Sequence, residues 1–293
     1  MKSILVTGAS GQLGREFEFL SQRTTDINFV FTDRTQIDLS KPSTLQMIDE
    51  VHPDILINCA AYTAVDKAES EPEKAMAYNA FILKDIAQRC ARLNIQLIHF
   101  SSDYVYHNFL RKPLVESDPT RPKGVYAKSK LKGEKVLLRH HPSPLIFRIS
   151  WLYSSFGHNF PKTILRLIAE RDQLSIVDDQ IGAPTYARDV AQMVVRLLEE
   201  TDPKELWDKK AGIYNYCNAG ATSWAGIAQH IVKRMESNCR ILPIPSVKYP
   251  TPAPRPRYSV LNLGKFKRNF DLPISLWQDS LDDCLDLLLN EKG

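Results

Sequence analysis

VTGASGQLG, residues 6–14, spaces three glycines at intervals of three, directly after an apolar run and at the start of a helix-like stretch. Glycine lets the backbone turn tightly and approach a pyrophosphate, whose charge is stabilised by free N–H groups at a helix N-terminus. The spacing alone could make a structural turn, but the strand–turn–helix context is the one a dinucleotide site requires. The residues predicted to form this cofactor cradle are Gly8, Gly11, Gln12, Leu13 and Gly14.

The chain beyond this stretch repeats the same alternation. Short apolar runs recur as INFVFTD, DILINCAAY, LIHFSSD and LIFRIS, and helix-like segments such as EPEKAMAYNAFILKDIAQRCARLN and YAKSKLKGEKVLL lie between them. Continuous apolar runs of this length are typical of strands that are buried on both faces. The alternation predicts an α/β fold with a Rossmann-like, doubly wound parallel sheet.

The rhythm changes after about Trp151, where amphipathic helical patterns follow one another and only one further strand, GIYNYCNAG, is evident. We expect a Rossmann domain made by residues 1–152 with 186–220. A smaller C-terminal substrate-binding domain should comprise 153–185 with 221–293. The proline-rich stretch at 242–259 could be a linker or a polyproline ligand for a partner domain.

Bulk composition indicates an ordinary globular protein. The 293 residues are 43% hydrophobic and 25% charged, and the net charge of +4 is spread along the chain, so we expect no nucleic-acid partner. Five scattered cysteines without a CxxC pair argue against a disulfide framework and a zinc site. The start of the chain is too short for a signal peptide and no apolar run reaches membrane length, which predicts a cytoplasmic protein without membrane contact.

The end of the second predicted strand bears on the choice of cofactor. Asp33 follows the glycines by about twenty residues, where a carboxylate would accept a hydrogen bond from the ribose 2′-OH of NAD. The adjacent Arg34 could instead hold the 2′-phosphate of NADP or stack on adenine. Together they predict loose discrimination, with NADPH or NADH as cofactor. Asp38 and Leu39 begin a polar turn that could touch the adenine or only cap a helix.

The third predicted strand ends in small residues. Ala60 and Ala61 would let a cofactor lie against the backbone at the carboxyl end of the strand, although tight packing would use alanine too. We extend the predicted cofactor contacts to Tyr62, Thr63 and Asn79.

SSDYVY ends the fourth predicted strand and places hydroxyl groups on the same edge of the sheet. Ser102 taken singly fits a capping residue, but it could also polarise a carbonyl oxygen. Tyr126 and Lys130 follow as i,i+4 neighbours on one helix face. A nearby ammonium favours the phenolate and should lower the pKa of the phenol from its reference value of about 10. The alternative is an aromatic and a cation that share an exposed helix surface.

These motifs resemble the extended branch of the short-chain dehydrogenase/reductase superfamily. The strings GQLG, AAYTAVDKAESEPE, SSDYVY, RISWLY, VDDQIGAPT and YPTPAPRP are similar to the dTDP-4-dehydrorhamnose reductase family, from Ile4 to about Leu261. The resemblance implies NAD(P)H-dependent reduction of the 4-keto group of dTDP-4-dehydro-L-rhamnose. It also implies a small-molecule nucleotide sugar as substrate, a nucleotide-sugar-binding role for the smaller domain, and a monomer or homodimer.

The resemblance also assigns roles to residues. It makes Tyr126 the proton donor and Lys130 the group that tunes it and contacts the nicotinamide ribose, and Ser102 would hold the sugar carbonyl. The predicted catalytic set is Ser102, Asp103, Tyr126 and Lys130, of which Tyr126 and Lys130 are also predicted cofactor contacts. The predicted substrate contacts are Ser102, Asp103 and Tyr104 facing the sugar, Trp151 against its ring, Asn159 near the nucleotide, and Arg255 on the diphosphate.

The sequence departs from the family pattern at several positions. The family commonly has Thr at Ser102 and Gly at Ala127, and it differs at Tyr106, His107 and Asn108. Some members share a metal between subunits through acidic residues. Glu16 matches one of these acids, but Arg188 stands where another would be, so we predict no metal.

Two other functions stay open. One is a reductase or epimerase acting on a different nucleotide-4-keto sugar, because pyranose pockets vary on a common scaffold. The other is a non-catalytic subunit like the regulatory subunit of methionine adenosyltransferase, which would be expected to lack an intact Ser–Tyr–Lys set.

Overall fold

The computed structural model describes residues 1–107 and 109–290, so Asn108 lies outside the described residues. Its centre is a six-stranded sheet in the order β10-β5-β4-β3-β1-β2, and every neighbouring pair is parallel. Each strand coincides with a predicted apolar run. The strands are β1 (Lys2–Thr7), β2 (Ile27–Thr32), β3 (Ile55–Asn58), β4 (Gln96–Ser102), β5 (Leu145–Ile149) and β10 (Gly212–Asn215).

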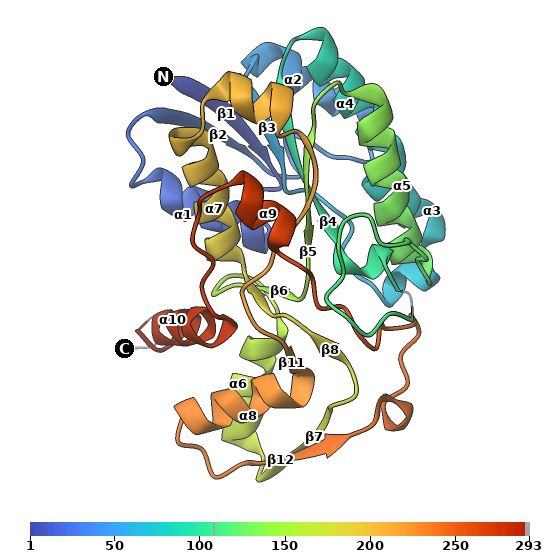
Figure 1. Ribbon diagram of the computed structural model, residues 1–293, viewed down its shortest axis with the longest axis vertical. Helices are drawn as coiled ribbons and strands as arrows, with labels where there is room; N and C mark the ends of the chain where they lie inside the picture. The colour runs from blue at the N-terminus through green and yellow to red at the C-terminus, as the bar shows by residue number, and fades with distance from the viewer. Residues whose placement is uncertain (108, 291–293) are drawn as a thin grey trace.

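Helices cover both faces of this sheet (Figure 1). One core joins Ile4 and Val6 of β1 to α1 (Gln12–Ser21) and α7 (Ala187–Glu200). The opposite core joins Leu5 of the same strand to α4 (Ile82–Arg92) and α5 (Val125–His140). Neighbouring strand residues point to opposite faces, so a strand covered on both sides must be apolar throughout. The predicted doubly wound α/β fold is confirmed.

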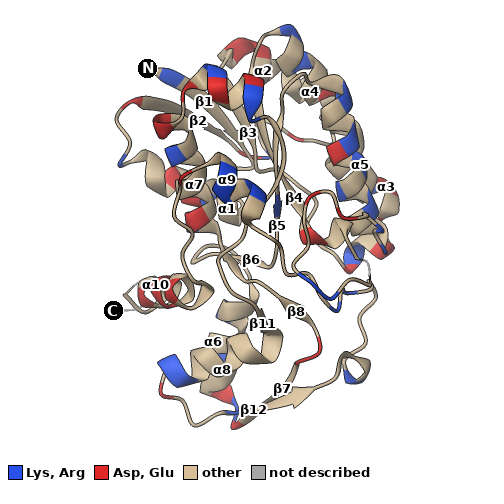
Figure 2. Ribbon diagram, viewed as in Figure 1, with Lys and Arg blue, Asp and Glu red and all other residues tan. Residues whose placement is uncertain are grey.

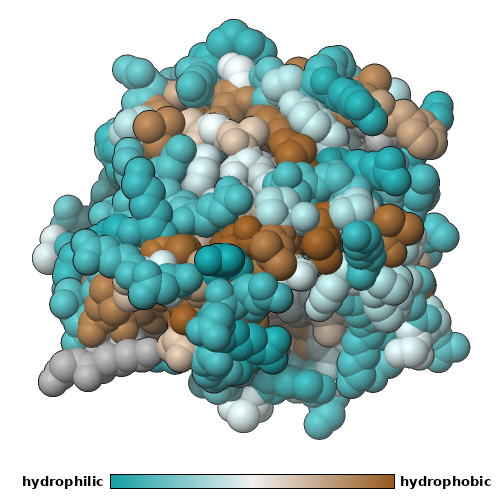
Figure 3. Space-filling view, turned by 90° about the horizontal axis from the view of Figure 1, so that it is seen from below, coloured by the Kyte–Doolittle hydropathy of each residue, from teal (hydrophilic) through white to brown (hydrophobic). Residues whose placement is uncertain are grey.

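A smaller unit lies below the sheet in Figure 1 and has a core of its own. Its two-stranded parallel sheet pairs β7 (Gln173–Val177) with β12 (Arg240–Ile244). Three amphipathic helices complete it: α6 (Phe160–Glu170), α8 (Trp224–Arg234) and α10 (Trp277–Asn290). Seen from below, hydrophobic side chains gather towards the middle of the face, with hydrophilic ones around them (Figure 3).

One late helix does not share that core. Phe266 of α9 (Gly264–Asn269) and the following Phe270 pack into the core of the large sheet, where they contact Tyr216 and Tyr214. The chain therefore returns to the large sheet within the segment 221–293 that we assigned to the smaller domain. The domain boundaries themselves stay a prediction.

The remaining elements are short. Additional helices and strands are α2 (Gln46–Val51), α3 (Pro72–Met76), β6 (Leu152–Tyr153), β8 (Ile181–Gly182), β9 (Thr185–Tyr186) and β11 (Thr222–Ser223). Single turns of 3₁₀-helix lie at Pro42–Leu45, Lys67–Glu69, Asp103–Val105 and Ser246–Lys248, and π-helical turns at Ala77–Phe81 and Glu205–Lys209. Acidic and basic residues are interspersed over these elements (Figure 2). Across residues 1–107 and 109–290, no helix is long and apolar enough to cross a membrane.

Candidate active site

The glycine cradle joins β1 to α1. Gly8 has φ +71°, and a Cβ there would lie 2.7 Å from the backbone nitrogen of Ala60. A Cβ on Gly14 would lie 2.3 Å from the carbonyl oxygen of Gly8, so helix and loop pack with no room for a side chain. Gly11 caps α1 without a side-chain hydrogen bond, which leaves backbone N–H groups at the helix N-terminus for an anion. The side chain of Leu13 is buried in the core, so only its backbone is suited to that contact.

The cradle lies where the strand order reverses. β1 pairs with β2 on one side and with β3 on the other, and Ala60 follows β3 directly beside Gly8. Ligands of open α/β sheets bind at the carboxyl ends of strands at such a switch point. The amide of Asn79 instead holds local structure, accepting from the Tyr62 backbone N–H at 2.9 Å and donating to the Ser129 hydroxyl at 3.0 Å.

The predicted ribose contacts differ in their accessibility. The Asp33 carboxylate accepts from the backbone N–H and hydroxyl of Thr35, and these bonds lower its pKa. Arg34 is largely exposed and donates to the Tyr78 hydroxyl at 2.8 Å. Asp38 is mostly buried and accepts from the Ser40 backbone and hydroxyl, which favours the structural turn over adenine contact. The side chain of Leu39 is buried in the core and therefore cannot make the predicted contact with the adenine.

The folding of β4 and α5 brings the predicted catalytic residues together. Ser102 ends β4, and its side chain lies close enough to the phenol of Tyr126, the second residue of α5, to influence the pKa of that phenol. The Ser102 hydroxyl also donates to Asp103 at 3.1 Å and accepts from the Tyr104 backbone N–H at 3.2 Å. The rings of Tyr104 and Tyr126 meet edge to face, with centroids 5.7 Å apart. A serine hydroxyl and a phenol thus converge at the carboxyl end of a central strand.

Burial controls the charge of these groups. It raises the pKa of Tyr126 to about 12, although the nearby Ser102 side chain acts in the opposite direction. Burial also lowers the pKa of Lys130 to about 8, against the influence of Glu134. The expected lowering of the phenol pKa by Lys130 is therefore wrong for this structure. The ammonium donates instead to the Phe100 carbonyl oxygen at 2.6 Å, and Tyr126 is a neutral phenol at pH 7 that carries a proton to give.

Asp103 is the other titratable group beside the pair. Burial raises its pKa to about 6, and hydrogen bonds with the Ser259 and Ser102 side chains oppose this shift. A carboxyl group with a pKa near neutrality beside a phenol is typical of functional sites.

A buried ion pair that the sequence analysis missed supports α5 behind the site. Arg148 of β5 binds Glu134 through two hydrogen bonds of 2.9 and 2.7 Å, and the Ser101 hydroxyl donates to the same carboxylate at 2.5 Å. Arg148 also donates to the Tyr106 hydroxyl at 2.8 Å. The signal in the sequence was an arginine within the apolar run LIFRIS, because a buried charge requires a buried partner.

Two predicted substrate contacts lie in structural positions. Trp151 has φ +46° and stacks on Trp224, with ring centroids 3.8 Å apart, so one face of its ring is already covered. Asn159 caps α6 by accepting from the Lys162 backbone N–H at 3.1 Å. Its amide donates to Gln12 at 2.9 Å, which links the smaller unit to the glycine cradle.

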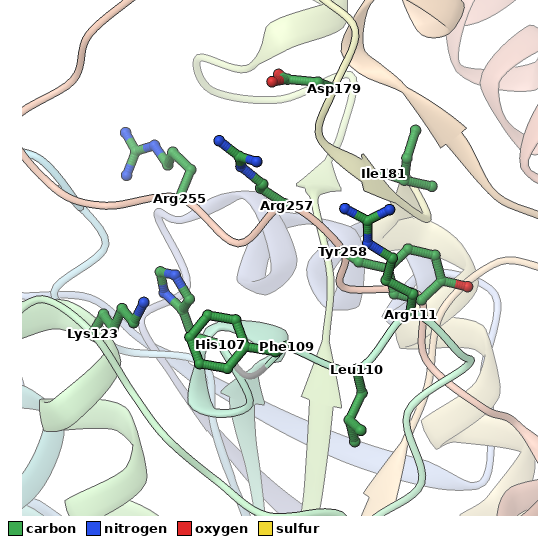
Figure 4. A pocket seen from close by; sticks show the side chains of 10 residues that line it. All are labelled: His107, Phe109, Leu110, Arg111, Lys123, Asp179, Ile181, Arg255, Arg257 and Tyr258. Atoms are coloured by element: carbon green, nitrogen blue, oxygen red, sulfur yellow. The ribbon is translucent and has the colours of Figure 1, made fainter. Parts of the chain in front are cut away.

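A cavity of about 520 Å³ is lined by cations, among which only Arg255 was predicted. Arg255 and Arg257 come from the proline-rich segment, and Arg111 and Lys123 from the loop between β4 and α5 (Figure 4). Figure 4 shows Phe109 across the cavity from the two arginines. The guanidinium of Arg255 lies 5.9 Å from the ring centre of Tyr104, the ring that contacts Tyr126. A cluster of cations next to a hydroxyl pair suits an anionic substrate that carries a reactive polar group.

The acid matched to a shared metal has another partner here. Arg188 donates to Glu16 at 2.8 Å, and the Ser154 hydroxyl donates to the other oxygen of the same buried carboxylate. Across residues 1–107 and 109–290, no group of three or more His, Cys, Asp or Glu side chains could hold a metal ion.

The chain is similar to known proteins over nearly its whole length. The model of a family described as RmlD substrate binding domain matches residues 1–290. The dTDP-4-dehydrorhamnose reductase of Shigella flexneri is 37% identical over 98% of both chains. Among solved structures, a dTDP-4-dehydrorhamnose reductase from Clostridium acetobutylicum aligns with TM-score 0.91 at 32% identity, covering 98% of this chain and 99% of that one. The Bacillus anthracis reductase in complex with NADP aligns with TM-score 0.90 at 32% identity and the same coverage.

Proposed function

Because the chain belongs to the RmlD substrate binding domain family, with dTDP-4-dehydrorhamnose reductases as relatives, we propose that it reduces dTDP-4-dehydro-L-rhamnose to dTDP-L-rhamnose with NADPH or NADH. The observation that carries this proposal is that Ser102 and the phenol of Tyr126 lie together at the sheet edge that carries the glycine cradle, with a cationic cavity next to Tyr104.

The residues at the cradle fit a dinucleotide. A Cβ at Gly8 or Gly14 would fill the space against the backbone, and α1 begins without a side-chain cap. Gly8, Gly11 and the N-terminus of α1 would hold the pyrophosphate, and Asp33 with Arg34 would face the adenosine ribose. The bound cofactor supplies a hydride to the 4-keto carbon.

The protein's own task is to bind the sugar oxygen and to protonate it. The Ser102 hydroxyl and the Tyr126 phenol would both face the 4-keto oxygen and stabilise the negative charge that develops there. Tyr126 would then donate its proton to that oxygen. Burial keeps the pKa of this phenol at about 12, so it is protonated before the reaction. Lys130, whose ammonium donates to the Phe100 carbonyl oxygen at 2.6 Å, would contact the nicotinamide ribose.

The cationic cavity would bind the diphosphate of the nucleotide. Arg255 already donates to Asp66 at 2.6 Å, and its Nη1 is buried without a hydrogen-bond partner among the described residues. The guanidinium therefore retains donor capacity, and a planar donor array suits a diphosphate.

The test is an assay of NAD(P)H oxidation by the purified chain with a panel of dTDP-4-keto-6-deoxy sugars. We expect turnover with dTDP-4-dehydro-L-rhamnose and formation of dTDP-L-rhamnose. Higher kcat/KM with another sugar of the panel would assign the chain to a reductase of that sugar. Absence of turnover with every sugar would favour a non-catalytic subunit.

Two further expectations accompany this function. A nucleotide-sugar reductase that uses NADPH should lie in the cytoplasm and act as a monomer or homodimer without nucleic acid. Fractionation of cells and sedimentation of the purified protein test these expectations.

A further inference from the structure

A turn outside the proposed catalytic machinery contacts two segments that the reaction uses. We call residues 66–69 the acidic turn. The Asp66 carboxylate accepts from the backbone N–H of Ala253 at 3.1 Å and from Arg255 at 2.6 Å. The Glu69 carboxylate accepts from the backbone N–H of Val125 at 2.7 Å. Two carboxylates three residues apart therefore hold the proline-rich segment on one side and the start of α5 on the other.

Asp66 acts on an arginine that would otherwise be free to move. An arginine side chain has many rotamers, and the segment around Arg255 has no regular secondary structure to fix it. Asp66 restrains both the side chain of Arg255 and the backbone at Ala253. Because only one nitrogen of Arg255 is bound to Asp66, the remaining donors stay available for an anion.

Glu69 acts on the helix that carries Tyr126. The residue before α5 is Gly124, which has no side chain to cap the helix, and Glu69 supplies the acceptor instead. A negative charge at this end of a helix is also stabilising. A Cβ on Gly124 would lie 2.7 Å from Glu69 Oε1 and 3.3 Å from Pro254 Cδ, so three segments meet at this glycine. Ala68 of the same turn is buried in a small hydrophobic cluster against which Val125 and Tyr126 pack.

We infer, on the basis of the proposed function, that the acidic turn is a positioning element with two separate tasks. Asp66 positions Arg255 for the substrate diphosphate, and Glu69 positions Tyr126 for proton transfer. The two carboxylates should therefore differ in kinetics. Loss of Asp66 should raise KM for the nucleotide sugar, and loss of Glu69 should lower kcat.

The first test measures binding of dTDP by calorimetry and steady-state kinetics with the sugar. Asp66→Asn should weaken dTDP binding by about tenfold or more, since it removes a charge-assisted hydrogen bond, while thymidine binding and kcat stay near wild type. Asp66→Glu keeps the charge but has a longer side chain. Its affinity for dTDP should lie between those of the wild type and Asp66→Asn. Glu69→Gln should lower kcat by about tenfold and leave dTDP affinity unchanged.

Two controls separate positioning from general stability. Asp286→Asn breaks a similar pair, between Asp286 and Arg234, in the smaller unit. This substitution should change neither the dTDP affinity nor kcat. In an Arg255→Ala background, Asp66→Asn should add nothing to the loss of dTDP affinity, because Asp66 acts through that arginine.

Unchanged or tighter dTDP binding by Asp66→Asn would overturn the role of Asp66, and the tighter result would mean that it competes with the diphosphate. Wild-type kcat in Glu69→Gln would overturn the role of Glu69. Failure of the wild-type chain to bind dTDP or to reduce the sugar would overturn the proposed function, and the inference with it.

Discussion

The proposed active site is formed mainly by closely packed backbone at its cofactor end and by charged side chains at its substrate end. At the cofactor end, Gly8 and Gly14 bring backbone against backbone between a buried strand and a helix. At the substrate end, Arg255 and Arg257 line a cavity from an irregular segment, and the side chain of Asp66 holds Arg255. Backbone packing tolerates no added atom, whereas charged side chains tolerate changes of shape but not of charge. The cofactor end should therefore be sensitive to added volume, and the substrate end to lost charge.

The largest effect is expected where the two ends meet. Tyr126→Phe removes the proton donor, while the ring still packs against Tyr104. We expect kcat to fall by about 10²–10⁴, the usual contribution of a positioned general acid. Dissociation constants for NADPH and dTDP should stay near wild type, as measured by fluorescence and calorimetry. Full activity in the folded variant would contradict the role of Tyr126 as the proton donor.

Arg255→Ala tests the end built from charge. Loss of the contact to the diphosphate should weaken substrate binding by about 1.5–3 kcal/mol, the value of a hydrogen bond to a charged group. KM for the nucleotide sugar should rise and NADPH affinity should stay unchanged. Arg166→Ala, which removes an exposed arginine paired with Glu170, is the matched control. A lowered melting temperature with normal KM would make Arg255 a structural residue.

Gly14→Ala tests the end built from backbone. The new Cβ would lie 2.3 Å from the Gly8 carbonyl oxygen, and overpacking of this kind costs about 1–3 kcal/mol of folding stability. Urea unfolding should show this loss, with weaker NADPH binding and unchanged dTDP binding. Gly11→Ala should be milder, because its Cβ would lie 3.2 Å from the same oxygen. If Gly14→Ala and Gly11→Ala weakened dTDP binding as much as NADPH binding, the glycines would not act on the cofactor end alone.

Substitution of Arg34 should have the smallest effect on activity, because its charge at the cofactor end is largely exposed. Wild-type turnover with NADPH and NADH should agree within roughly a hundredfold, since Asp33 suits a 2′-OH and Arg34 a 2′-phosphate. Arg34→Ala should shift the ratio of kcat/KM values towards NADH by about two- to fivefold, as expected for an exposed charge. Complete exclusion of one cofactor by the wild type would refute this interpretation of the strand end.

The sequence predicted the regular part of the molecule well, because strands and glycine turns have local signatures. All six strands of the large sheet coincide with apolar runs, and Ser102 and Tyr126 are adjacent as expected. Contacts between distant segments have no such signature. The stacking of Trp151 on Trp224 depends on how the smaller unit folds.

Electrostatic predictions failed for a related reason. The expected effect of Lys130 on Tyr126 followed from helix spacing, but the pKa of the phenol depends mainly on burial, which sequence spacing does not reveal. The cations Arg111, Lys123 and Arg257 were likewise missed, because they converge from two irregular segments.

The most direct test of the central claim follows deuterium from NADPH that carries deuterium at both hydrogens of nicotinamide C4 into the product formed from dTDP-4-dehydro-L-rhamnose. We predict dTDP-L-rhamnose that carries one deuterium on C4 of the sugar, as located by NMR, and a rate of labelled product formation that falls by about 10²–10⁴ in Tyr126→Phe. Unlabelled product, a label at another carbon, or equal rates in the two proteins would contradict the account.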